Sequence, residues 1–319
     1  MTRQRQRGAA LLLAMLTVTL VATLSAAALW QQWRSVEVES AERARVQSGW
    51  ILNGALDWAR LILREDARTG GADHLAEPWA VGLQEARLST FLSADATSVD
   101  DPAQDAFLSG QITDLQGRLN VNNLIEDNKL SATAQQAFSR LFRLLGLPPS
   151  ELTLLTTQLL LAQKGNDGNG SSVGVPLRPQ RVEQLIWLGL SPQTVALLRP
   201  YVTMLPEGTD RTKLNINTAS AEALYAAIDG LSLADAQRLV AARANSHYTS
   251  LGDAAKVVSG VDSASNSGQL SVSSRFFEVR GRLRIERSVV EEVSVVQRDG
   301  LTVRTLWREH GIAPLVAPS

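Results

Sequence analysis

The N-terminal 30 residues constrain this chain more than any other segment, because they contain 21 consecutive uncharged residues, from Ala9 to Leu29. A helix of this length spans about 30 Å, the thickness of the hydrocarbon core of a bilayer. Arginines occupy positions 3, 5 and 7, directly before the stretch. The positive-inside rule therefore predicts a cytoplasmic N-terminus and places the bulk of the chain on the other side of the membrane.

The alternative to a permanent membrane span is a cleaved signal peptide, because residues 26–28 are all alanine and offer a small-residue cleavage site. The helical periodicity continues beyond the apolar stretch, however, and no proline occurs before Pro78. We therefore expect one helix from about Ala9 to about Arg68, with its second half packed on a soluble domain.

An apolar stripe follows one face of this expected helix, at helical spacing. We interpret the stripe as core packing. Its members are Trp30, Trp33, Val36, Ala44, Gln47, Ile51, Ala55, Trp58 and Ile62.

The composition excludes several classes of protein. The chain has 319 residues, with 31 Lys and Arg against 32 Asp and Glu, and this balance argues against a non-specific nucleic-acid binder. It contains no cysteine, which removes disulfides, thiolate metal sites and cysteine nucleophiles. Its three histidines, at positions 74, 247 and 310, show no ligand spacing. A histidine-based metal or triad site is therefore not expected.

The first residues resemble the leader of type IV prepilins and pseudopilins, a short basic segment that ends in glycine and is followed by an apolar helix. The resemblance implies that prepilin peptidase cleaves the Gly8–Ala9 bond and that Ala9, the mature N-terminus, is N-methylated. Most members of this superfamily have Glu at the fifth mature position, where this chain has Leu13. That departure is typical of one branch, the K-type minor pseudopilins of the type II secretion system.

Three further segments resemble the same branch: Asp57–Leu63, Ile112–Leu124 and Leu198–Ser220. The second contains the family pattern Asp-x-x-Gly-Arg-x-Asn-x-Asn, and in this chain its residues are Asp114, Gly117, Arg118, Asn120 and Asn122.

The resemblance implies a non-enzymatic assembly protein in the bacterial inner membrane, with a single span and a periplasmic bulk. It implies a subunit at the pseudopilus tip that helps to initiate assembly. The implied partners are other minor pseudopilins, the major pseudopilin, the inner-membrane assembly platform, prepilin peptidase and, further, secreted substrates; nucleic acid is not among them.

The remaining pattern predicts an α+β fold in which one antiparallel sheet is interrupted by a large all-α insertion. We expect a leader at 1–8, a membrane span at 9–29, the helix continuation and first strands at 30–125, an inserted helical domain at 126–265, closing strands at 266–312 and a tail at 313–319.

The first strands are predicted at Ile112–Asp114 and Arg118–Val121, joined in a tight hairpin at Gln116-Gly117. The neighbouring asparagines, at 120, 122 and 123, are interpreted as partners of backbone groups at strand ends and turns rather than as ligands.

Capping signals mark several helices of the insertion. Gly146 and Gly189 are predicted to end helices, and Ser191 is predicted to begin one. Another helix is predicted to start at Asn217-Thr218, and Ser232 with Asp235 resembles a capping box.

After Ser271 the period changes to two, which predicts strands at Phe277–Glu286, Ser288–Arg298 and Leu301–Trp307, with a hairpin at Asp299-Gly300. The arginines at 280, 282 and 284 are interpreted as one solvated strand face. Glu291 and Glu292 are predicted to point to opposite faces of their strand and so do not form a catalytic pair.

Catalytic motifs are absent from the sequence: it contains no P-loop, no Gly-x-Ser-x-Gly and no His-Glu-x-x-His. No cofactor is therefore expected. Asp167 and Asn169 in the linker echo a calcium loop, and relatives of the resembled family bind calcium through an acidic stretch in the insertion. Calcium takes six to eight oxygen ligands, and this chain has lost nearly all of those carboxylates. Calcium is therefore not among the expected cofactors.

A second hypothesis concerns Leu214–Arg243, which resembles the helix-hairpin-helix units of membrane-anchored DNA-uptake receptors. Such units bind phosphate through backbone N–H groups at a Gly-x-Gly hairpin. Here the hairpin, Asp229–Ser232, has one glycine and an adjacent acid, and lacks a basic cluster. We therefore favour a protein-interaction role and keep DNA binding as the alternative.

Overall fold

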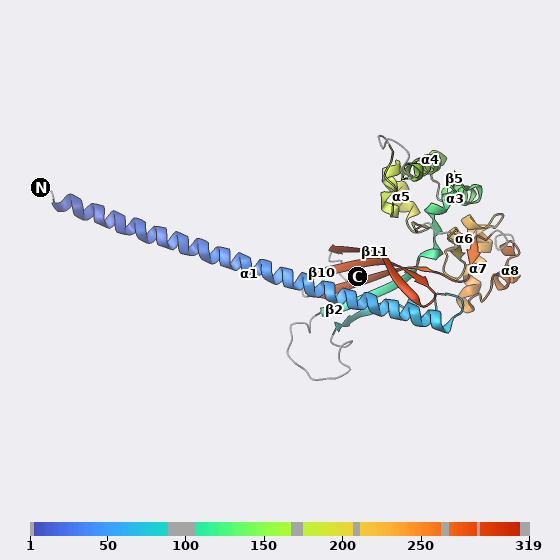
Figure 1. Ribbon diagram of the computed structural model, residues 1–319, viewed down its shortest axis with the longest axis horizontal. Helices are drawn as coiled ribbons and strands as arrows, with labels where there is room; N and C mark the ends of the chain where they lie inside the picture. The colour runs from blue at the N-terminus through green and yellow to red at the C-terminus, as the bar shows by residue number, and fades with distance from the viewer. Residues whose placement is uncertain are drawn as a thin grey trace. The chain divides into compact units, whose positions relative to one another are not determined.

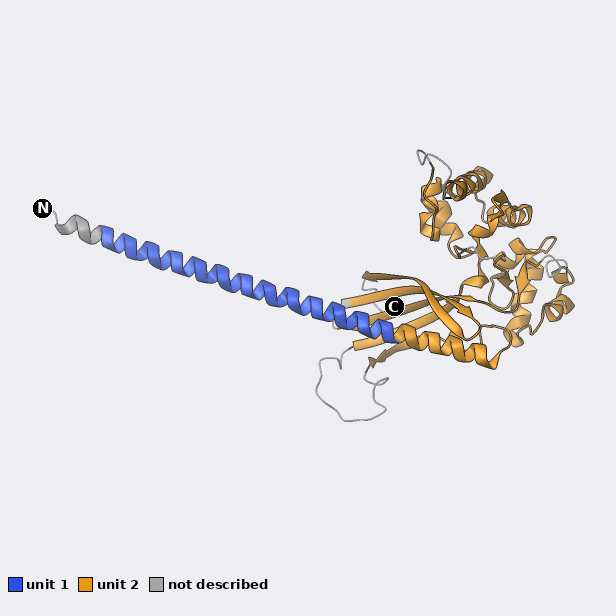
Figure 2. Ribbon diagram, in the orientation of Figure 1, with its two compact units in different colours: residues 1–54 blue, residues 55–319 orange. Residues whose placement is uncertain are grey.

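The computed structural model describes residues 3–88, 106–166, 175–206, 211–262, 268–285 and 288–312. The chain divides into two compact units, residues 1–54 and 55–319, which are coloured separately in Figure 2.

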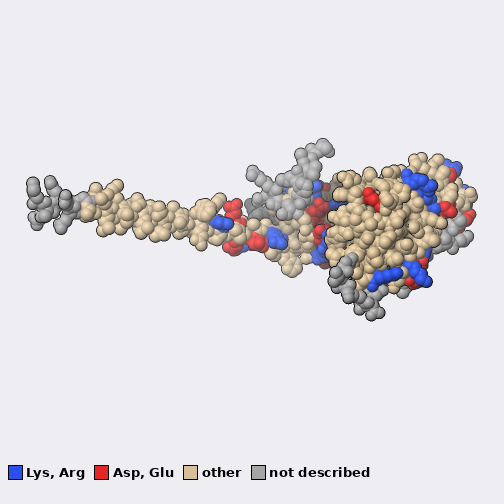
Figure 3. Space-filling model, turned by 90° about the horizontal axis from the view of Figure 1, so that it is seen from above, with Lys and Arg blue, Asp and Glu red and all other residues tan. Residues whose placement is uncertain are grey.

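Helix α1 runs without interruption from Arg3 to Thr69 and confirms the long helix predicted from the sequence. It ends at Gly70 and Gly71, whose φ angles of 70° and 128° lie in the region that favours glycine. Of the helices that the structure describes, α1 alone is both long enough and apolar enough to cross a membrane. From Ala9 on, α1 carries no charged side chain until Arg34, and Figure 3 shows this part of the helix in tan.

The second unit contains a five-stranded antiparallel sheet in the order β1-β2-β9-β10-β11 (Figure 1). The partners β2 and β9 are far apart in the sequence, and they pair from Ala106 opposite Ile285 to Asp114 opposite Phe277. Everything between them is therefore inserted into one sheet, as predicted. The strands are β1 (Leu83–Arg87), β2 (Ala106–Asp114), β9 (Phe276–Ile285), β10 (Ser288–Asp299) and β11 (Thr302–Ile312).

The last part of α1 packs on this sheet through Leu56, Ala59 and Leu63. Their partners include Phe277 and Val296 of the central strands. These residues recur at i, i+3 and i+7, the spacing of one helix face. The short helix η1 (Pro78–Ala80) adds a buried tryptophan to the same core.

The prediction for this face of α1 was only partly right, because Ile62 is half-buried and packs against the core. Trp58, expected in the core, is 51% exposed, whereas Leu63 is fully buried. The stripe through Ala55, Trp58 and Ile62 lies one residue, about 100°, from the buried stripe. Both stripes are apolar, so periodicity alone does not distinguish them. Arg60 adds the anchoring contacts, because its guanidinium donates to the carbonyl oxygen of Val303 at 2.7 and 3.0 Å.

The predicted hairpin between Ile112–Asp114 and Arg118–Val121 is also wrong. After β2 the chain makes a 3₁₀ turn, η3 (Leu115–Gly117), and β3 (Leu119–Asn120) then pairs in parallel with β6 (Val202–Thr203). Because β9 already occupies the hydrogen-bonding edge of β2, the chain leaves the sheet here and enters the insertion.

Helices between β2 and β9 form the insertion. Most begin at a serine N-cap whose hydroxyl accepts a backbone N–H, as at Ser131, Ser191 and Ser250. The helices are α3 (Ala132–Leu144), α4 (Pro149–Asn166), η5 (Val182–Leu188), α5 (Pro192–Leu198), α6 (Ala221–Ala227), α7 (Leu233–Asn245) and α8 (Leu251–Val257).

One detail of the predicted caps differs. Helix α6 begins after Ser220 rather than at Asn217-Thr218, because Asn217 is bound elsewhere. At the start of α7, Ser232 accepts the N–H of Asp235 and donates its hydroxyl to the carboxylate of Asp235.

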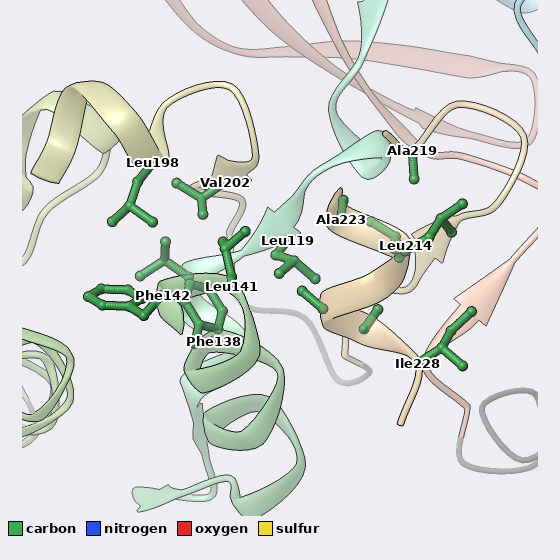
Figure 4. Packing of buried hydrophobic residues seen from close by; sticks show 14 of the residues in the cluster. Leu119, Phe138, Leu141, Phe142, Leu198, Val202, Leu214, Ala219, Ala223 and Ile228 are labelled. Carbon is green, nitrogen blue, oxygen red and sulfur yellow. The ribbon is translucent and has the colours of Figure 1, made fainter. Parts of the chain in front are cut away.

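A continuous apolar core holds the insertion together. It extends from Leu119 through Phe138, Leu141 and Phe142 of α3 to Ile228 after α6 (Figure 4). Short strand pairs close it: β4 (Ile125–Glu126) with β5 (Lys129–Leu130), and β7 (Leu214–Asn215) with β8 (Leu270–Ser271). The four-residue turn η4 (Val121–Leu124) completes it.

The C-terminal strands agree with the sequence prediction. Gly300, with φ of 56°, makes the turn between β10 and β11. Phe277, Val279 and Leu283 are buried, whereas Arg280 and Arg284 lie on the other face and pair with glutamates.

Candidate functional site: a buried polar junction

The two motif segments singled out in the sequence meet at the end of β2, where the sheet joins the insertion. Asp114, the last residue of β2, is buried there together with Asn215 of β7 and Ser274, which precedes β9. We call this group, with Thr218 and Gln116, the junction network.

The Asp114 carboxylate accepts four hydrogen bonds. Oδ1 accepts the backbone N–H of Gln116 at 2.7 Å. Oδ2 accepts the hydroxyls of Thr218 and Ser274, each at 2.6 Å, and the side-chain amide of Asn215 at 3.0 Å. One side chain therefore ties together the strand that leaves the sheet, the middle of the insertion and the strand that returns.

Burial raises the pKa of Asp114, while the four donors act in the opposite direction. Both oxygens are already occupied by groups of the chain itself. This arrangement suits a structural joint rather than proton transfer to a ligand.

Gly117 is required by close packing. A Cβ at this position would lie 3.1 Å from the carbonyl oxygen of Thr218 and 3.1 Å from its hydroxyl. The backbone of η3 must approach Thr218 this closely for the Thr218 hydroxyl to reach Asp114. The glycine of the motif thus sets the distance between the sheet and the insertion.

The asparagines of the motif hold two other segments, in agreement with their interpretation as partners of backbone groups. Asn120 accepts the N–H of Leu205 at 3.1 Å, and Asn122 donates to the carbonyl oxygen of Leu205 at 2.7 Å. Asn123 exchanges two hydrogen bonds with the backbone of Thr212. These three asparagines therefore hold the chain at Leu205 and at Thr212.

Arg118, the remaining residue of the motif, is half-buried and lies outside the junction network. It lines a cleft together with Asn120, Phe138 and Arg211. Arg211 also forms an ion pair with Glu126.

Sequence reasoning missed several residues of this region. Asn215 accepts the N–H of Asn217, just as Asn120 accepts that of Asn122 and Asp114 that of Gln116. These are Asx turns, and the repeated Asx-x-Asn or Asx-x-Gln spacing is the signal that indicates them.

Arg298 of β10 was also missed. It is buried, forms ion pairs with Asp66 of α1 and with Asp73, and donates to the carbonyl oxygen of Ser274 at 2.9 Å. Burial raises the pKa of Asp73, and the charge of Arg298 opposes this shift. Nothing in the local sequence indicates this pairing, because Arg298 is more than 200 residues from Asp66 and Asp73.

The carboxylates of Asp66, Asp73 and Glu77 lie within 4.8 Å of one another, in a set of the kind that holds a metal ion. Arg298 already pairs with the first two. Glu77 accepts the N–H of His74 at 2.8 Å and the indole N–H of Trp79 at 2.7 Å. The chain's own donors thus occupy this cluster.

The N-terminal residues singled out in the sequence belong to the other compact unit, residues 1–54. Gly8 and Ala9 lie within α1, and Leu13 is 66% exposed on it. The calcium candidates Asp167 and Asn169 fall outside the described residues.

The helix-hairpin-helix segment forms two helices, α6 and α7, joined through Gly230 with φ of 73°. Arg140 of α3 pairs with Asp229 at 2.7 Å and donates to the carbonyl oxygen of Ala226 at 2.8 Å. The hairpin is therefore bound to a neighbouring helix. On the face seen in Figure 3, basic and acidic side chains are interspersed, unlike a DNA-binding surface.

Comparisons with known proteins agree with one another. Two family models described as "Type II secretion system (T2SS), protein K" match residues 117–207 and 214–273. Type II secretion system protein K of Pectobacterium carotovorum subsp. carotovorum is 26% identical, over 97% of this chain and 98% of that protein. The Klebsiella pneumoniae protein of the same name is 26% identical over 97% of each chain.

The fold also matches a solved structure, the crystal structure of the GspK–GspI–GspJ complex from the enterotoxigenic Escherichia coli type 2 secretion system. The TM-score is 0.61 at 18% identity, with 86% of this chain and 99% of the matched chain covered. These matches give no support to the DNA-uptake alternative. Both family models, the full-length relatives and the fold agree, and the chain is a member of the type II secretion system protein K family, the K-type minor pseudopilins.

Proposed function

We propose that this chain occupies the tip of the pseudopilus and helps to start its assembly, as a structural component rather than an enzyme. The observation that carries the proposal is Leu13, at the position where most pseudopilins have Glu. In those proteins the carboxylate meets the free N-terminal amine of a neighbouring protomer, and this pairing offsets the cost of a charge in an apolar environment.

A subunit with Leu13 offers no such carboxylate to a protomer above it. Its own N-terminal amine, on Ala9 after cleavage, remains available to the Glu of a protomer below. The contact is therefore one-sided, which suits the end of a fibre. The helical insertion adds bulk to the sheet domain, and we infer that it leaves no room for another subunit on top.

The proposed partners are other minor pseudopilins, because the matched fold comes from a complex of GspK with GspI and GspJ. We further propose an inner-membrane location with a cytoplasmic N-terminus, on the basis of the arginines at positions 3, 5 and 7. Contacts with the major pseudopilin, the assembly platform and secreted substrates belong to the same proposal.

Cleavage is tested by the intact mass of the membrane-extracted protein from cells with prepilin peptidase. The wild type should lose residues 1–8, and Gly8→Val should retain them, because a side chain here obstructs the approach of the peptidase to the backbone. Ala10→Val, two residues further on, is the matched control and should mature normally. Loss of about 28 residues would instead indicate a signal peptide.

The tip position is tested by labelling the periplasmic part of the protein on isolated pseudopili. Wild-type label should occur at fibre ends only, and regular labelling along the shaft would refute the proposal. Leu13→Glu should restore the missing carboxylate and allow shaft labelling. Leu12→Glu introduces the same charge one residue away, and should not. If neither variant changes a tip-only pattern, the location stands and its cause is the insertion.

A further inference from the structure

Two of the chain's three histidines meet ring to ring, although they are far apart in the sequence. His74 lies in the loop that follows α1, and His247 lies in the loop between α7 and α8 of the insertion. Their ring centroids are 3.7 Å apart and the planes differ by 13°, so the rings are stacked.

The hydrogen bonding of His74 identifies its protonation state. Its Nδ1 accepts the backbone N–H of Ala76 at 3.2 Å, so this nitrogen carries no proton and the ring is neutral. Protonation at Nδ1 breaks that bond. A second imidazolium directly above the first adds repulsion between like charges at close range.

Both loops are fixed close to the stacked rings. Next to His247, Tyr248 exchanges two backbone hydrogen bonds with the Asn217 side chain, each 2.9 Å long. Next to His74, the carboxylate of Asp73 pairs with Arg298. The stack therefore joins the loop after α1 to the insertion, and each of the two loops is held in place next to its histidine.

The charged neighbours of His74 come from two elements. Asp66 of α1 favours the protonated ring, whereas burial and the His247 ring disfavour it, and together they lower the pKa of His74. Glu77 of the same loop has its pKa raised to about 7 by burial. The Glu77 carboxylate contacts His74 through the backbone, since it accepts the N–H of His74 at 2.8 Å.

We propose that the His74–His247 stack is a pH-sensitive latch between the loop after α1 and the helical insertion. It is closed when the His74 ring is neutral and released when His74 becomes protonated. Because the pKa of His74 is lowered, this change occurs below the ordinary histidine pKa of about 6.5.

The coupling between the rings is tested by NMR titration of the full chain in detergent micelles, with ¹³C-labelled histidine. Single His→Gln variants assign the three signals. The midpoint of His74 should lie below 6.5 in the wild type and rise in His247→Gln, because a repelling partner is removed. An unchanged His74 midpoint in that variant would overturn the proposal.

Release of the latch is tested with a spin label at Leu75→Cys, an exposed position in the same loop. The chain has no native cysteine, so labelling is specific. The label should become more mobile between pH 8 and pH 5, whereas a label at Leu301→Cys, in the exposed β10–β11 turn, should not. The His74→Gln/His247→Gln double variant should abolish the pH response.

Two outcomes would contradict the latch. One is an immobile Leu75 label at a pH where NMR shows His74 protonated. The other is a pH response that survives in the double variant, or that disappears in Glu77→Gln with both histidines present. The last result would identify Glu77, rather than the histidine pair, as the titrating group.

Discussion

Replacing Asp114 with alanine tests whether the junction network holds the insertion to the sheet. The substitution removes the acceptor of four hydrogen bonds, with lengths from 2.6 to 3.0 Å. Asn215 keeps the carbonyl oxygen of Asp73 as a partner, whereas the N–H of Gln116 loses the acceptor that fixes η3. The hydroxyls of Thr218 and Ser274 lose a charged acceptor and must reorient.

The magnitude follows from these losses. An unsatisfied buried N–H costs about 1–3 kcal/mol, and each hydrogen bond to a charged group contributes about 1.5–3 kcal/mol. Against this, burial of the carboxylate is itself unfavourable, as the raised pKa of Asp114 indicates. We expect a net loss of about 2–4 kcal/mol in the free energy of unfolding, or roughly 4–16 °C in Tm for a unit of this size.

The assay is thermal unfolding of the detergent-solubilised full chain, followed by circular dichroism. Asp57→Ala is the matched control: its side chain is 71% exposed and pairs only with Arg60 among the described residues, so the expected change is about 0.5 kcal/mol or less. If the free energy of unfolding of Asp114→Ala lies within about 0.5 kcal/mol of the wild-type value, the cost of burying the carboxylate cancels the contribution of its hydrogen bonds. The network would then not stabilise the junction.

Two further predictions concern packing. Gly117→Ala should lower stability by about 1–3 kcal/mol, because its Cβ would press on Thr218, whereas Gly54→Ala in α1, with nothing within 4 Å of the added Cβ, should raise helix stability by about 0.5–1 kcal/mol. If Gly117→Ala and Gly54→Ala changed the free energy of unfolding in denaturant equally, the backbone of η3 would not lie as close to Thr218 as the structure shows. Leu63→Ala should cost about 2–5 kcal/mol, because Leu63 is fully buried, whereas Leu61→Ala, at a position 49% exposed, should cost far less. The reverse order in the same assay would mean that α1 buries its other face.

Local signals in the sequence predicted most individual elements. The uncharged stretch from Ala9, the serine N-caps and the Asp299-Gly300 turn each depend on residues within a few positions of one another, so the helix, most caps and the last hairpin agree with expectation. The Asx turn at Asn120 is local as well, whereas the bonds of Asn120 and Asn122 to Leu205 are long-range.

Long-range packing decided the rest. The face of α1 that is buried depends on where Phe277 and Val296 present their side chains, and two apolar stripes on one helix satisfy the same periodicity. The pairing of β2 with β9 rather than with the segment after Gly117 depends on a strand that lies beyond the whole insertion.

The sequence by itself determined that the chain has a long N-terminal helix, an α+β composition and the motif of its family, because those properties follow from neighbouring residues. Only the tertiary structure decided that Asp114, Asn215 and Ser274 form one network and that His74 meets His247. Each of these contacts joins segments separated by at least one complete element of the fold. Their energies depend on burial and on distances that exist only after the chain has folded.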